Sequence, residues 1–379
     1  MNIFKINKEE MEKNVIHDFD KEEPEATKRS KNREPLANWA IIVAVLVLVS
    51  FAILLAVLAI LKFSDKKEVV KEVTYTIEEV QQMLEDESNK SSTAQEEARI
   101  RGREEALEEL KISLMTGDSA IKAIRPFYPD ELVLAANGAY VFVPIDRTLS
   151  MNDLEQSGVQ ALENGEYQYV KDGNVISRKG IDVSSHQGKI KWDEVAADGV
   201  EFAFIRAVYR GYGSAGKLME DERFDANMQG AMNNGIEVGA YVFTQAVTEE
   251  EVLEEARLAI SKVSKYTDDC TIVVDVEKTA DASGRMNALT PEERTRLVKL
   301  FCETVEEAGY KPMIYFNLEM AILMLDLEEL EEYDKWFAAY SDTLYYPYDY
   351  EIWQYSEKGE VAGISGPVDL DISIGKLSD

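Results

Sequence analysis

The sequence predicts an α/β protein whose C-terminal part, from about residue 179, forms one eight-stranded barrel. Eight short runs rich in β-branched and aromatic residues occur over about 200 residues, and helical segments lie between several of them. Near-continuous apolar runs of this kind are typical of parallel strands that are covered on both faces. Because this length leaves too little room for eight full helices, we expect an irregular TIM-like (β/α) barrel with fewer helices than strands.

Capping residues support this order of elements. Thr290 and Glu293 have the spacing of a capping box, Pro291 occupies the first helical position, and the same Thr-x-x-Glu pattern begins at Thr248. Gly309 is placed to end the helix that begins after Thr290. The eight expected strands are 180–184, 201–208, 236–244, 270–277, 312–317, 335–340, 351–356 and 368–373.

Residues 40–61 form an uncharged apolar run. At about 1.5 Å per helical residue, the run is long enough to cross the roughly 30 Å core of a bilayer. A buried core helix and a cleaved signal peptide are the alternatives. Both fit less well, because the run has no polar face and about 39 residues precede it. We therefore predict one uncleaved signal-anchor helix over residues 39–63, with Trp39 and Phe63 as interfacial aromatics.

The segments on either side of this run differ from it in composition. Residues 1–38 are polar with mixed charge, which predicts a disordered tail. Residues 64–117 place apolar side chains at helical spacings, with a polar interruption over 87–98. A plain amphipathic stalk and a short coiled coil both fit this pattern, and either would be an oligomerisation element. Residues 65–179 as a whole could self-associate or bind a partner of an envelope-spanning machine.

Residues 118–178 predict a small α+β module without chemistry of its own. Ala-Asn-Gly at 136–138 separates two apolar runs, and Asp-Gly-Asn at 172–174 separates two more, so each is a hairpin signal. The segment 151–165 between the hairpins could form a helix.

The composition excludes several classes of protein. The 379 residues carry 72 acidic and 41 basic side chains, a net charge of −31, and residues 180–379 hold 40 acidic and 18 basic side chains. This balance argues against a nucleic-acid binder and against a polybasic membrane-surface protein. Cys270 and Cys302 are the only cysteines, and His17 and His186 the only histidines. We therefore expect no disulfide framework, no Cys- or His-rich metal site, and reduced cysteines.

Carboxyl side chains interrupt three of the expected strands. They are Asp182 on the first, Asp275 and Glu277 on the fourth, and Asp369 and Asp371 on the last. Burying an unpaired carboxylate costs several kcal/mol, so acids in apolar strands need a reason. Because active sites of such barrels gather at strand ends, we expect these acids to meet in one site.

Asp275 and Glu277 form the pair that predicts the chemistry. Side chains two apart on a strand point to the same face, about 6.6 Å along it, so the two carboxyls can stand roughly 5–7 Å apart. Repulsion raises the pKa of one of two acids this close, which leaves it protonated as a general acid. The spacing suits hydrolysis of a glycosidic bond. A pair of surface acids on an edge strand is the alternative, and the valines around the pair disfavour it.

The motifs of residues 180–379 resemble glycoside hydrolase family 25, the lysozymes called N-acetylmuramidases. The resemblance rests on GIDVSSHQGKIKW at 180–192, FAFIRA at 202–207, GIEVGAYVF at 235–243, DVE at 275–277, and WQYS with VAGISGPVDLD within 353–371. It implies hydrolysis of the β-1,4 bond between N-acetylmuramic acid and N-acetylglucosamine in peptidoglycan, without a cofactor. Because peptidoglycan lies outside the cell, it also implies a cytoplasmic N-terminus and a barrel on the cell-wall side of the membrane.

The resemblance assigns roles to individual residues. Glu277 is expected to be the proton donor and Asp275 the second carboxylate, with Asp182 and Asp369 completing the acids of the site. Tyr241 resembles the family's sugar-contacting tyrosine, and we expect Tyr315, Trp353 and Gln354 to contact substrate as well, whereas Phe243 and Tyr355 are equally well read as core. Whether configuration is retained or inverted stays open.

Two departures from the family pattern stand out. Val242 occupies a place where many members have His, and Asp371 a place where Asn is common. Neither removes one of the four acids, so activity is expected to survive, and His186 is best read as a loop histidine. The alternative from another functional class is a wall-binding scaffold with a degenerate lysozyme domain, and the intact acids argue against it.

Overall fold

The computed structural model describes residues 49–50, 53 and 76–374. The chain divides into two compact units, residues 1–96 and 97–379. The predicted tail 1–38 and nearly all of the predicted span 39–63 lie outside the described residues, so both stay predictions. Within the described residues, none of the helices combines the length and the apolar character that a bilayer crossing requires.

Helix α4 (Ile77–Met115) covers 39 residues of the predicted stalk. It continues through 87–98, where the polar sequence predicts an interruption, so that prediction is wrong. Glu, Gln, Lys and Ala are good helix formers and outweigh the serines there. Thr93 also satisfies its hydroxyl inside the helix, by donating to the carbonyl oxygen of Asn89 at 2.9 Å.

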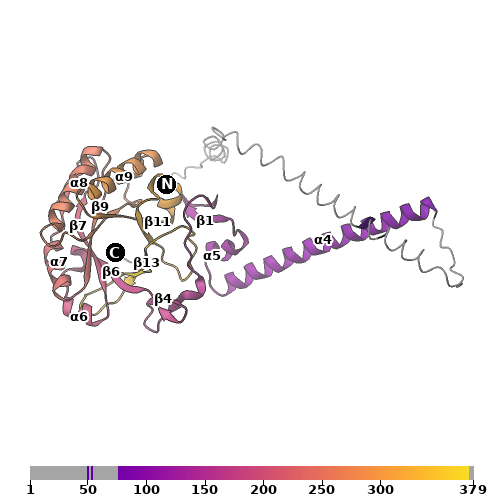
Figure 1. Ribbon diagram of the computed structural model, residues 1–379, viewed down its shortest axis with the longest axis horizontal. Helices are drawn as coiled ribbons and strands as arrows, with labels where there is room; N and C mark the ends of the chain where they lie inside the picture. Colours follow the sequence, from indigo (N-terminus) through magenta and orange to yellow (C-terminus); the bar gives the residue numbers. More distant parts are fainter. Residues whose placement is uncertain (1–48, 51–52, 54–75, 375–379) are drawn as a thin grey trace, which may run out of the picture. The chain divides into compact units, whose positions relative to one another are not determined.

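Eight strands close a barrel in the unit 97–379, which Figure 1 shows in a view into the ring. Their order is β6, β14, β13, β12, β11, β10, β9, β7, and the pairing of β6 with β7 closes it. This confirms the predicted eight-stranded α/β barrel. The strands are β6 (Arg178–Val183), β7 (Phe202–Arg210), β9 (Glu237–Phe243), β10 (Thr271–Asp275), β11 (Lys311–Asn317), β12 (Asp334–Ala338), β13 (Ile352–Gly359) and β14 (Val368–Ser373). A short ninth strand, β8 (Leu218–Glu220), extends β7 as an antiparallel partner.

The last strand departs from the expected parallel barrel. β14 pairs antiparallel with both β13 and β6. The connection from β13 to β14, residues 360–367, is too short for the helical crossover that a parallel strand needs. As a result the beginning of β14, rather than its end, lies beside the end of β6, and Asp369 pairs with Asp182.

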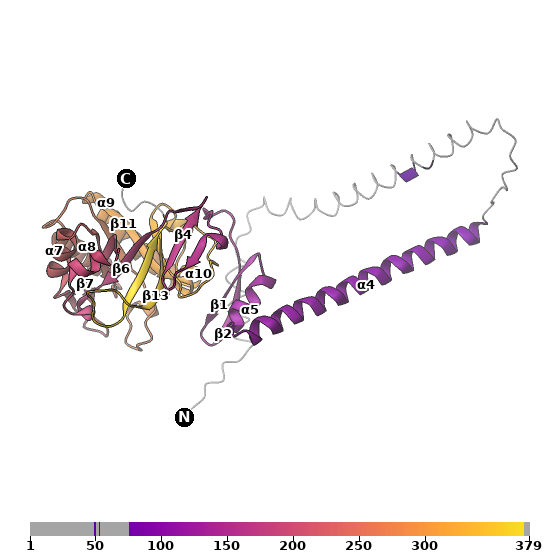
Figure 2. The same cartoon turned by 90° about the horizontal axis from the view of Figure 1, so that it is seen from below.

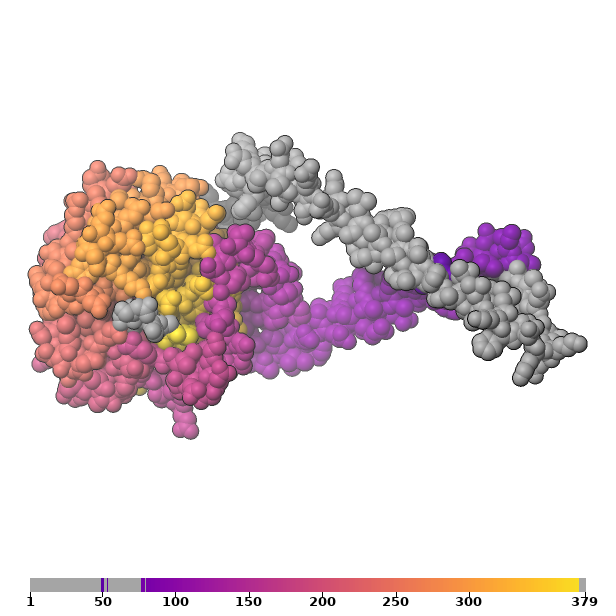
Figure 3. Space-filling model, viewed as in Figure 1, coloured from indigo at the N-terminus to yellow at the C-terminus, as the bar shows by residue number. Residues whose placement is uncertain are grey.

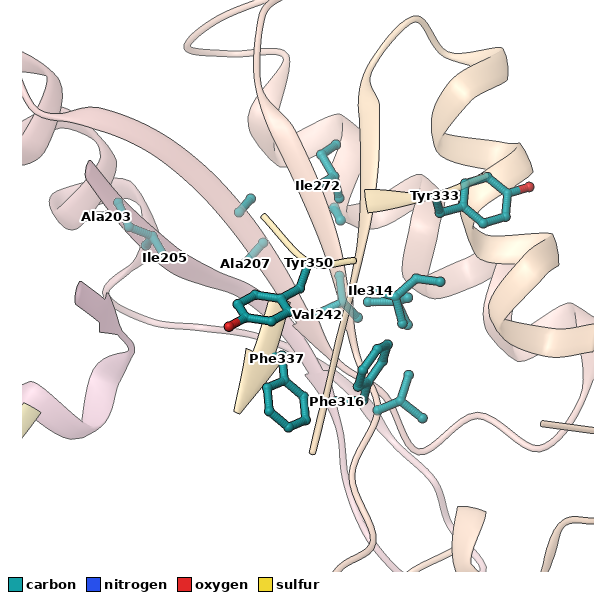
Figure 4. Close-up of a cluster of buried hydrophobic side chains, with 14 of the residues drawn as sticks. Ala203, Ile205, Ala207, Val242, Ile272, Ile314, Phe316, Tyr333, Phe337 and Tyr350 are labelled. Carbon is teal, nitrogen blue, oxygen red and sulfur yellow. The ribbon is translucent and has the colours of Figure 1, made fainter. Parts of the chain in front are cut away.

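Five α-helices lie between β6 and β14 along the chain, so helices are fewer than strands, as predicted. They are α6 (Trp192–Ala197), α7 (Phe224–Asn233), α8 (Glu249–Val263), α9 (Pro291–Glu307) and α10 (Leu318–Leu323). The outward residues of the strands form a buried core, and Figure 4 shows part of it around Ile205, Val242, Ile272, Ile314 and Phe337. Cys270 and Cys302 are buried free thiols within the same core.

The predicted capping box is complete on α9 and half present on α8. Thr290 Oγ1 accepts from the amide of Glu293, whose carboxylate accepts from the amide of Thr290 at 2.9 Å. Thr248 likewise accepts from the amide of Glu251. The Glu251 carboxylate, however, turns to the amide of Val247 and to Arg285. A stronger partner, the Arg285 guanidinium, therefore replaces the reciprocal half of the box.

Large rings fill the interior of the barrel because two glycines make room for them. A Cβ on Gly180 would lie 2.0 Å from the ring of Phe202, and a Cβ on Gly239 would lie 2.2 Å from the ring of Phe204. The Phe204 ring in turn stacks on Trp336, with ring centroids 4.7 Å apart. These rings fill the interior at the end of the barrel where the parallel strands begin. The polar side chains lie at the opposite end, where the parallel strands terminate.

The module 118–178 contains both predicted hairpins. β1 (Glu131–Ala136) and β2 (Ala139–Pro144) pair across Asn137 and Gly138, whose φ angles of 51° and 78° are those of a two-residue hairpin turn. β4 (Tyr167–Lys171) and β5 (Asn174–Val175) pair across Asp172 and Gly173 in the same way. Residues 151–165 form a 3-10 turn and the short strand β3 (Val159–Ala161) instead of the possible helix. Pairing with β4 satisfies the β3 backbone, which explains the difference.

This module packs against the barrel on the side of β13. Figures 1 and 2 place β1 and β4 beside the ring, and Figure 3 shows magenta atoms of the module adjoining yellow atoms of the last strands. The ring of Tyr167 stacks on the ring of Trp353 at 5.7 Å. Asn152 Nδ2 donates to the carbonyl oxygens of Tyr346 and Tyr348, in the loop between β12 and β13. The module therefore fixes the loop that carries Tyr340.

Candidate active site

A cavity of about 300 Å³ opens where the parallel strands end. Asp275 is the last residue of β10, and Glu277 lies two residues beyond it. All the predicted site residues except Trp353 line this cavity. The complete lining is Asp182, His186, Arg206, Tyr212, Tyr241, Phe243, Asp275, Glu277, Tyr315, Trp336, Tyr340, Gln354 and Asp369.

Strand alternation selects these side chains. On each strand every second residue faces the interior, so Asp275 shares a face with Val273, and Tyr241 with Gly239. Val273 and Tyr241 belong to the interior cluster, whereas Val274 and Val242 belong to the outer core. The acids thus cap a column of inward residues at the open end of the barrel.

Asp275 and Glu277 are both removed from bulk water. Asp275 is 8% exposed, and burial together with the neighbouring Glu277 raises its pKa well above the ordinary value, although Arg206 opposes this rise. Burial also raises the pKa of Glu277, and a hydrogen bond with Tyr315 opposes it. Among the described residues, Asp275 Oδ1 has no hydrogen-bond partner. The pair therefore offers one carboxyl that can hold a proton and one oxygen free to accept from a substrate.

Gln354 organises the floor of the cavity. Its Oε1 accepts from the hydroxyls of Tyr315 at 2.8 Å and Tyr340 at 3.0 Å, and its Nε2 donates to Asp182 Oδ2 at 2.7 Å. These three bonds determine which end of the amide is which. Because a phenol has one proton, Gln354 and Glu277 compete for that of Tyr315, which couples the amide to the acid pair.

Three further acids surround Gln354. Burial and the charges of Asp369 and Asp371 raise the pKa of Asp182 well above its ordinary value. Burial, Glu357 and Glu277 raise the pKa of Asp369 to about 6. Asp371 lies deeper, fully buried, and its Oδ1 accepts from Trp336 Nε1 at 2.8 Å. So many acids in one site repel one another, which favours the protonated form of some of them.

Arg206 is a cation of the cavity that the sequence analysis missed. Its Nε donates to Asp221 Oδ2 at 2.9 Å, and its Nη2 donates to Ser185 Oγ at 3.2 Å. Asp221 is buried and holds the guanidinium in place. A basic residue two positions after Phe204 in an apolar strand is the same signal that identified the acids, so the pattern could have revealed it.

Aromatic side chains form the walls of the cavity. Tyr241 and Tyr315 lie there as predicted, both packed edge-on against Trp336. Phe243 also lines the cavity, and Tyr212 and Tyr340 are exposed at its rim, at 41% and 54%. Tyr212 and Tyr340 lie on loops without a periodic pattern, so the sequence could not place them.

Trp353 is the one predicted site residue that lies elsewhere. It is 1% exposed, its Nε1 donates to the carbonyl oxygen of Ala339 at 2.8 Å, and its ring stacks on Tyr167. Gln354 faces the interior of β13, so its neighbour must face outward. The predicted sugar contact of Trp353 therefore does not fit its position, and Tyr355 packs on the same outer face.

The sequence of the barrel is similar to a known family of glycosidases. The model of the glycosyl hydrolases family 25 matches residues 181–364. The uncharacterized protein YegX of Escherichia coli K12 is 31% identical over 212 residues, which are 53% of this chain and 71% of YegX. The chain belongs to glycosyl hydrolase family 25. It is therefore a glycoside hydrolase of the lysozyme type.

Two family 25 relatives carry names that describe an activity. The autolytic lysozyme of Clostridium acetobutylicum is 28% identical over 206 residues, 51% of this chain and 55% of that protein. Lysozyme M1 of Streptomyces globisporus is 27% identical over 199 residues, 50% of this chain and 66% of that protein. The family match starts at β6, so the helix α4 and the module 118–178 lie outside it.

Proposed function

We propose that this family 25 hydrolase is a membrane-anchored muramidase. It cleaves the β-1,4 bond between N-acetylmuramic acid and N-acetylglucosamine in peptidoglycan. The observation that carries the proposal is the pair Asp275 and Glu277 at one end of a closed barrel, Asp275 buried and Glu277 half-buried, both with raised pKa. The names of the two related lysozymes support the choice of substrate.

In this proposal Glu277 protonates the leaving oxygen of the glycosidic bond. Its raised pKa favours the protonated form that a general acid needs, and the nearby Tyr315 hydroxyl opposes the rise in pKa. Asp275 assists, since its unpartnered Oδ1 can accept the N–H of a substrate acetamido group or face an oxocarbenium-like sugar. Asp182 and Asp369 complete the acidic floor beside them.

The side chains that line the cavity match the chemistry of a sugar. Tyr241 and Tyr315 offer ring edges, Gln354 offers an amide, and the exposed rings of Tyr212 and Tyr340 stand at the rim. Pyranose rings have apolar faces that pack on aromatic rings and hydroxyls that need polar partners. This mixture of rings and hydrogen-bonding groups favours a glycan strand over a purely apolar ligand.

The test is digestion of purified bacterial wall by the full chain. We expect release of reducing ends by the native protein and at least about a 100-fold lower rate for Glu277→Gln, since general acid catalysis contributes about 10²–10⁴-fold. Glu163→Gln, which changes an exposed acid of the module, is the matched control and should digest at the native rate. Binding to wall without release of reducing ends by the native chain would contradict the proposal and favour a scaffold.

We also propose that residues 39–63 anchor the enzyme, with the N-terminus in the cytoplasm and the hydrolase on the wall side. The apolar sequence of residues 40–61 supports this, and the substrate decides the direction. Protease added to intact spheroplasts should remove the hydrolase and spare a tag on residue 1. Protection of the hydrolase from protease would refute this orientation.

We propose further that α4 associates with a second copy of itself. Ile100, Leu107 and Leu114 recur every seven residues along the helix and are 45–55% exposed, which is the spacing at which one position of a coiled coil repeats. Sedimentation of the full chain should report a dimer or larger species, and Leu107→Gln with Leu114→Gln should shift it to monomer. A native monomer would leave the plain stalk as the better description.

A further inference from the structure

Asp371 is an acid that the proposed mechanism does not use. It lies on β14 behind the cavity and is 0% exposed. Its Oδ1 accepts from Trp336 Nε1 at 2.8 Å. Among the described residues, Oδ2 finds no N–H or O–H donor. A fully buried carboxylate oxygen without a donor is costly, so this atom requires a partner that the usual donors do not supply.

The partner that faces it is another acid. The carboxyl of Asp371 lies within hydrogen-bonding reach of the carboxyl of Asp182, and Asp182 in turn accepts from Gln354 Nε2 at 2.7 Å on its Oδ2. Carboxylates are acceptors only when they are ionised, so a hydrogen bond between two carboxyls requires a proton on one of them. The two carboxyls can therefore hydrogen-bond at this contact only if one of them carries a proton.

The surrounding charges do not favour two ionised carboxylates here. Asp369 on β14 and Asp275 at the end of β10 face the pair, and Glu277 and Arg206 line the same cavity. The phenols around them are those of Tyr241, Tyr315, Tyr340 and Tyr355. Arg206 is the cation among them, and it is already bound by Asp221. Three acids against one committed cation leave the pair without a counter-charge.

We propose that Asp182 and Asp371 hold a single proton between them while the enzyme works, so that Asp371 is a positioning residue for Asp182. The shared proton satisfies Asp371 Oδ2 and limits the pair to one negative charge. Trp336 donates to Asp371 Oδ1 and Gln354 donates to Asp182 Oδ2. These two hydrogen bonds fix the orientation of both carboxyls. The two acids then titrate as one unit.

The number of protons that Asp182 and Asp371 hold can be measured without an activity assay. At pH 8 the infrared C=O band of protonated carboxyls should lose the equivalent of one group in Asp371→Asn, because Asp182 then ionises alone beside an amide donor. The double variant Asp182→Asn/Asp371→Asn should lose no more than that. Asp369→Asn is the control, since a pKa of about 6 leaves Asp369 ionised at pH 8 and no band should be lost.

Two infrared results would overturn the proposal. A band unchanged in both Asp371→Asn and the double variant would mean that both acids are ionised in the native protein, and a second group lost in the double variant would mean that both are protonated. Carbon-13 NMR of native protein labelled at the aspartate carboxyls gives the same count without a substitution. It decides the question if a variant does not fold.

The positioning role of Asp371 rests on the proposed muramidase activity, so it is tested by kinetics, separately from the infrared count of protons. Asp371→Asn keeps a donor toward Asp182 and should hold kcat/KM on wall within about tenfold of native, whereas Asp371→Leu should lower kcat/KM about 100-fold with little change in KM. Equal rates for the two variants would overturn the positioning role. An inactive native chain with the expected infrared count would instead refute the muramidase assignment and leave the shared proton standing.

Discussion

Gln354 Nε2 donates to Asp182 Oδ2 across 2.7 Å and joins residues that are 172 positions apart in the chain. The same amide accepts from Tyr315 and Tyr340, which come from β11 and from the loop after β12. One neutral side chain therefore ties four segments of the barrel to one acid. Its amide orients that acid without adding charge to a site already rich in carboxyls.

Gln354→Leu should lower kcat/KM on bacterial wall by about 10–100-fold and leave the barrel folded. Leucine has a similar volume, but it leaves the Asp182 carboxylate and two tyrosine hydroxyls without their partner, and misplacement of a catalytic group costs about this much. Steady-state kinetics of reducing-end release, with circular dichroism for the fold, measure the effect.

Trp353→Phe, one position away, is the control for this prediction. Trp353 faces the outer core, so the smaller ring should lower the melting temperature and leave kcat/KM within about twofold of native. A larger kinetic loss from Trp353→Phe than from Gln354→Leu would show that the two sides of β13 have been assigned wrongly.

The melting temperature should be higher at pH 5 than at pH 8. Asp182, Asp275, Asp369 and Asp371 have folded pKa values above their unfolded values. Their contribution to stability is therefore complete below about pH 4 and is lost as the pH rises through the folded pKa. Acids whose pKa is lowered by folding are ionised in both states above pH 5, so they add no slope in this window.

Asp369 provides the internal check, because its folded pKa is about 6. Between pH 5 and pH 8 it should account for about 1 kcal/mol of the lost stability. Scanning calorimetry of Asp369→Asn should show a shallower fall than the native protein. A native protein that melts higher at pH 8 than at pH 5 would contradict the raised pKa values.

Asn152→Ala should lower the free energy of unfolding by about 1–3 kcal/mol. It removes the donors to the carbonyl oxygens of Tyr346 and Tyr348, and unpaired carbonyls in a packed loop carry that cost. Urea unfolding measures it. Asn174→Ala, at the exposed β4–β5 hairpin, is the matched control and should change stability by less than about 0.5 kcal/mol. Similar losses in both would mean that the module does not support the loop.

Gly180→Ala should destabilise the barrel by about 1–3 kcal/mol, because the new Cβ would lie 2.0 Å from the ring of Phe202 and one of them must move. Gly102→Ala in α4 meets no heavy atom within 4 Å and should not lower stability. Thermal melts of the two variants separate overpacking from a general effect of replacing glycine. A tolerated Gly180→Ala would show that the interior is looser than the packing indicates.

The candidate site was predictable where its residues follow the strand period. Asp182, Asp275 and Tyr241 each alternate with apolar neighbours on a strand, and this local pattern fixes which face they occupy. Arg206 carries the same signal, because it is a charged residue two positions after Phe204 on an apolar strand. Tyr212 and Tyr340 lie on loops, where no period exists, so no reading of the sequence could bring them to the rim.

Local sequence patterns were enough to predict the eight strands, the two hairpin turns and the acids on the strands. These follow from side-chain alternation, turn residues and capping, which act between residues near in sequence. The tertiary structure alone decided that β14 runs antiparallel, that Gln354 rather than Trp353 faces the cavity, and that Asp371 meets Asp182. Those relationships depend on how the closing sheet pairs distant strands, and strand pairing is a long-range choice that no local pattern encodes.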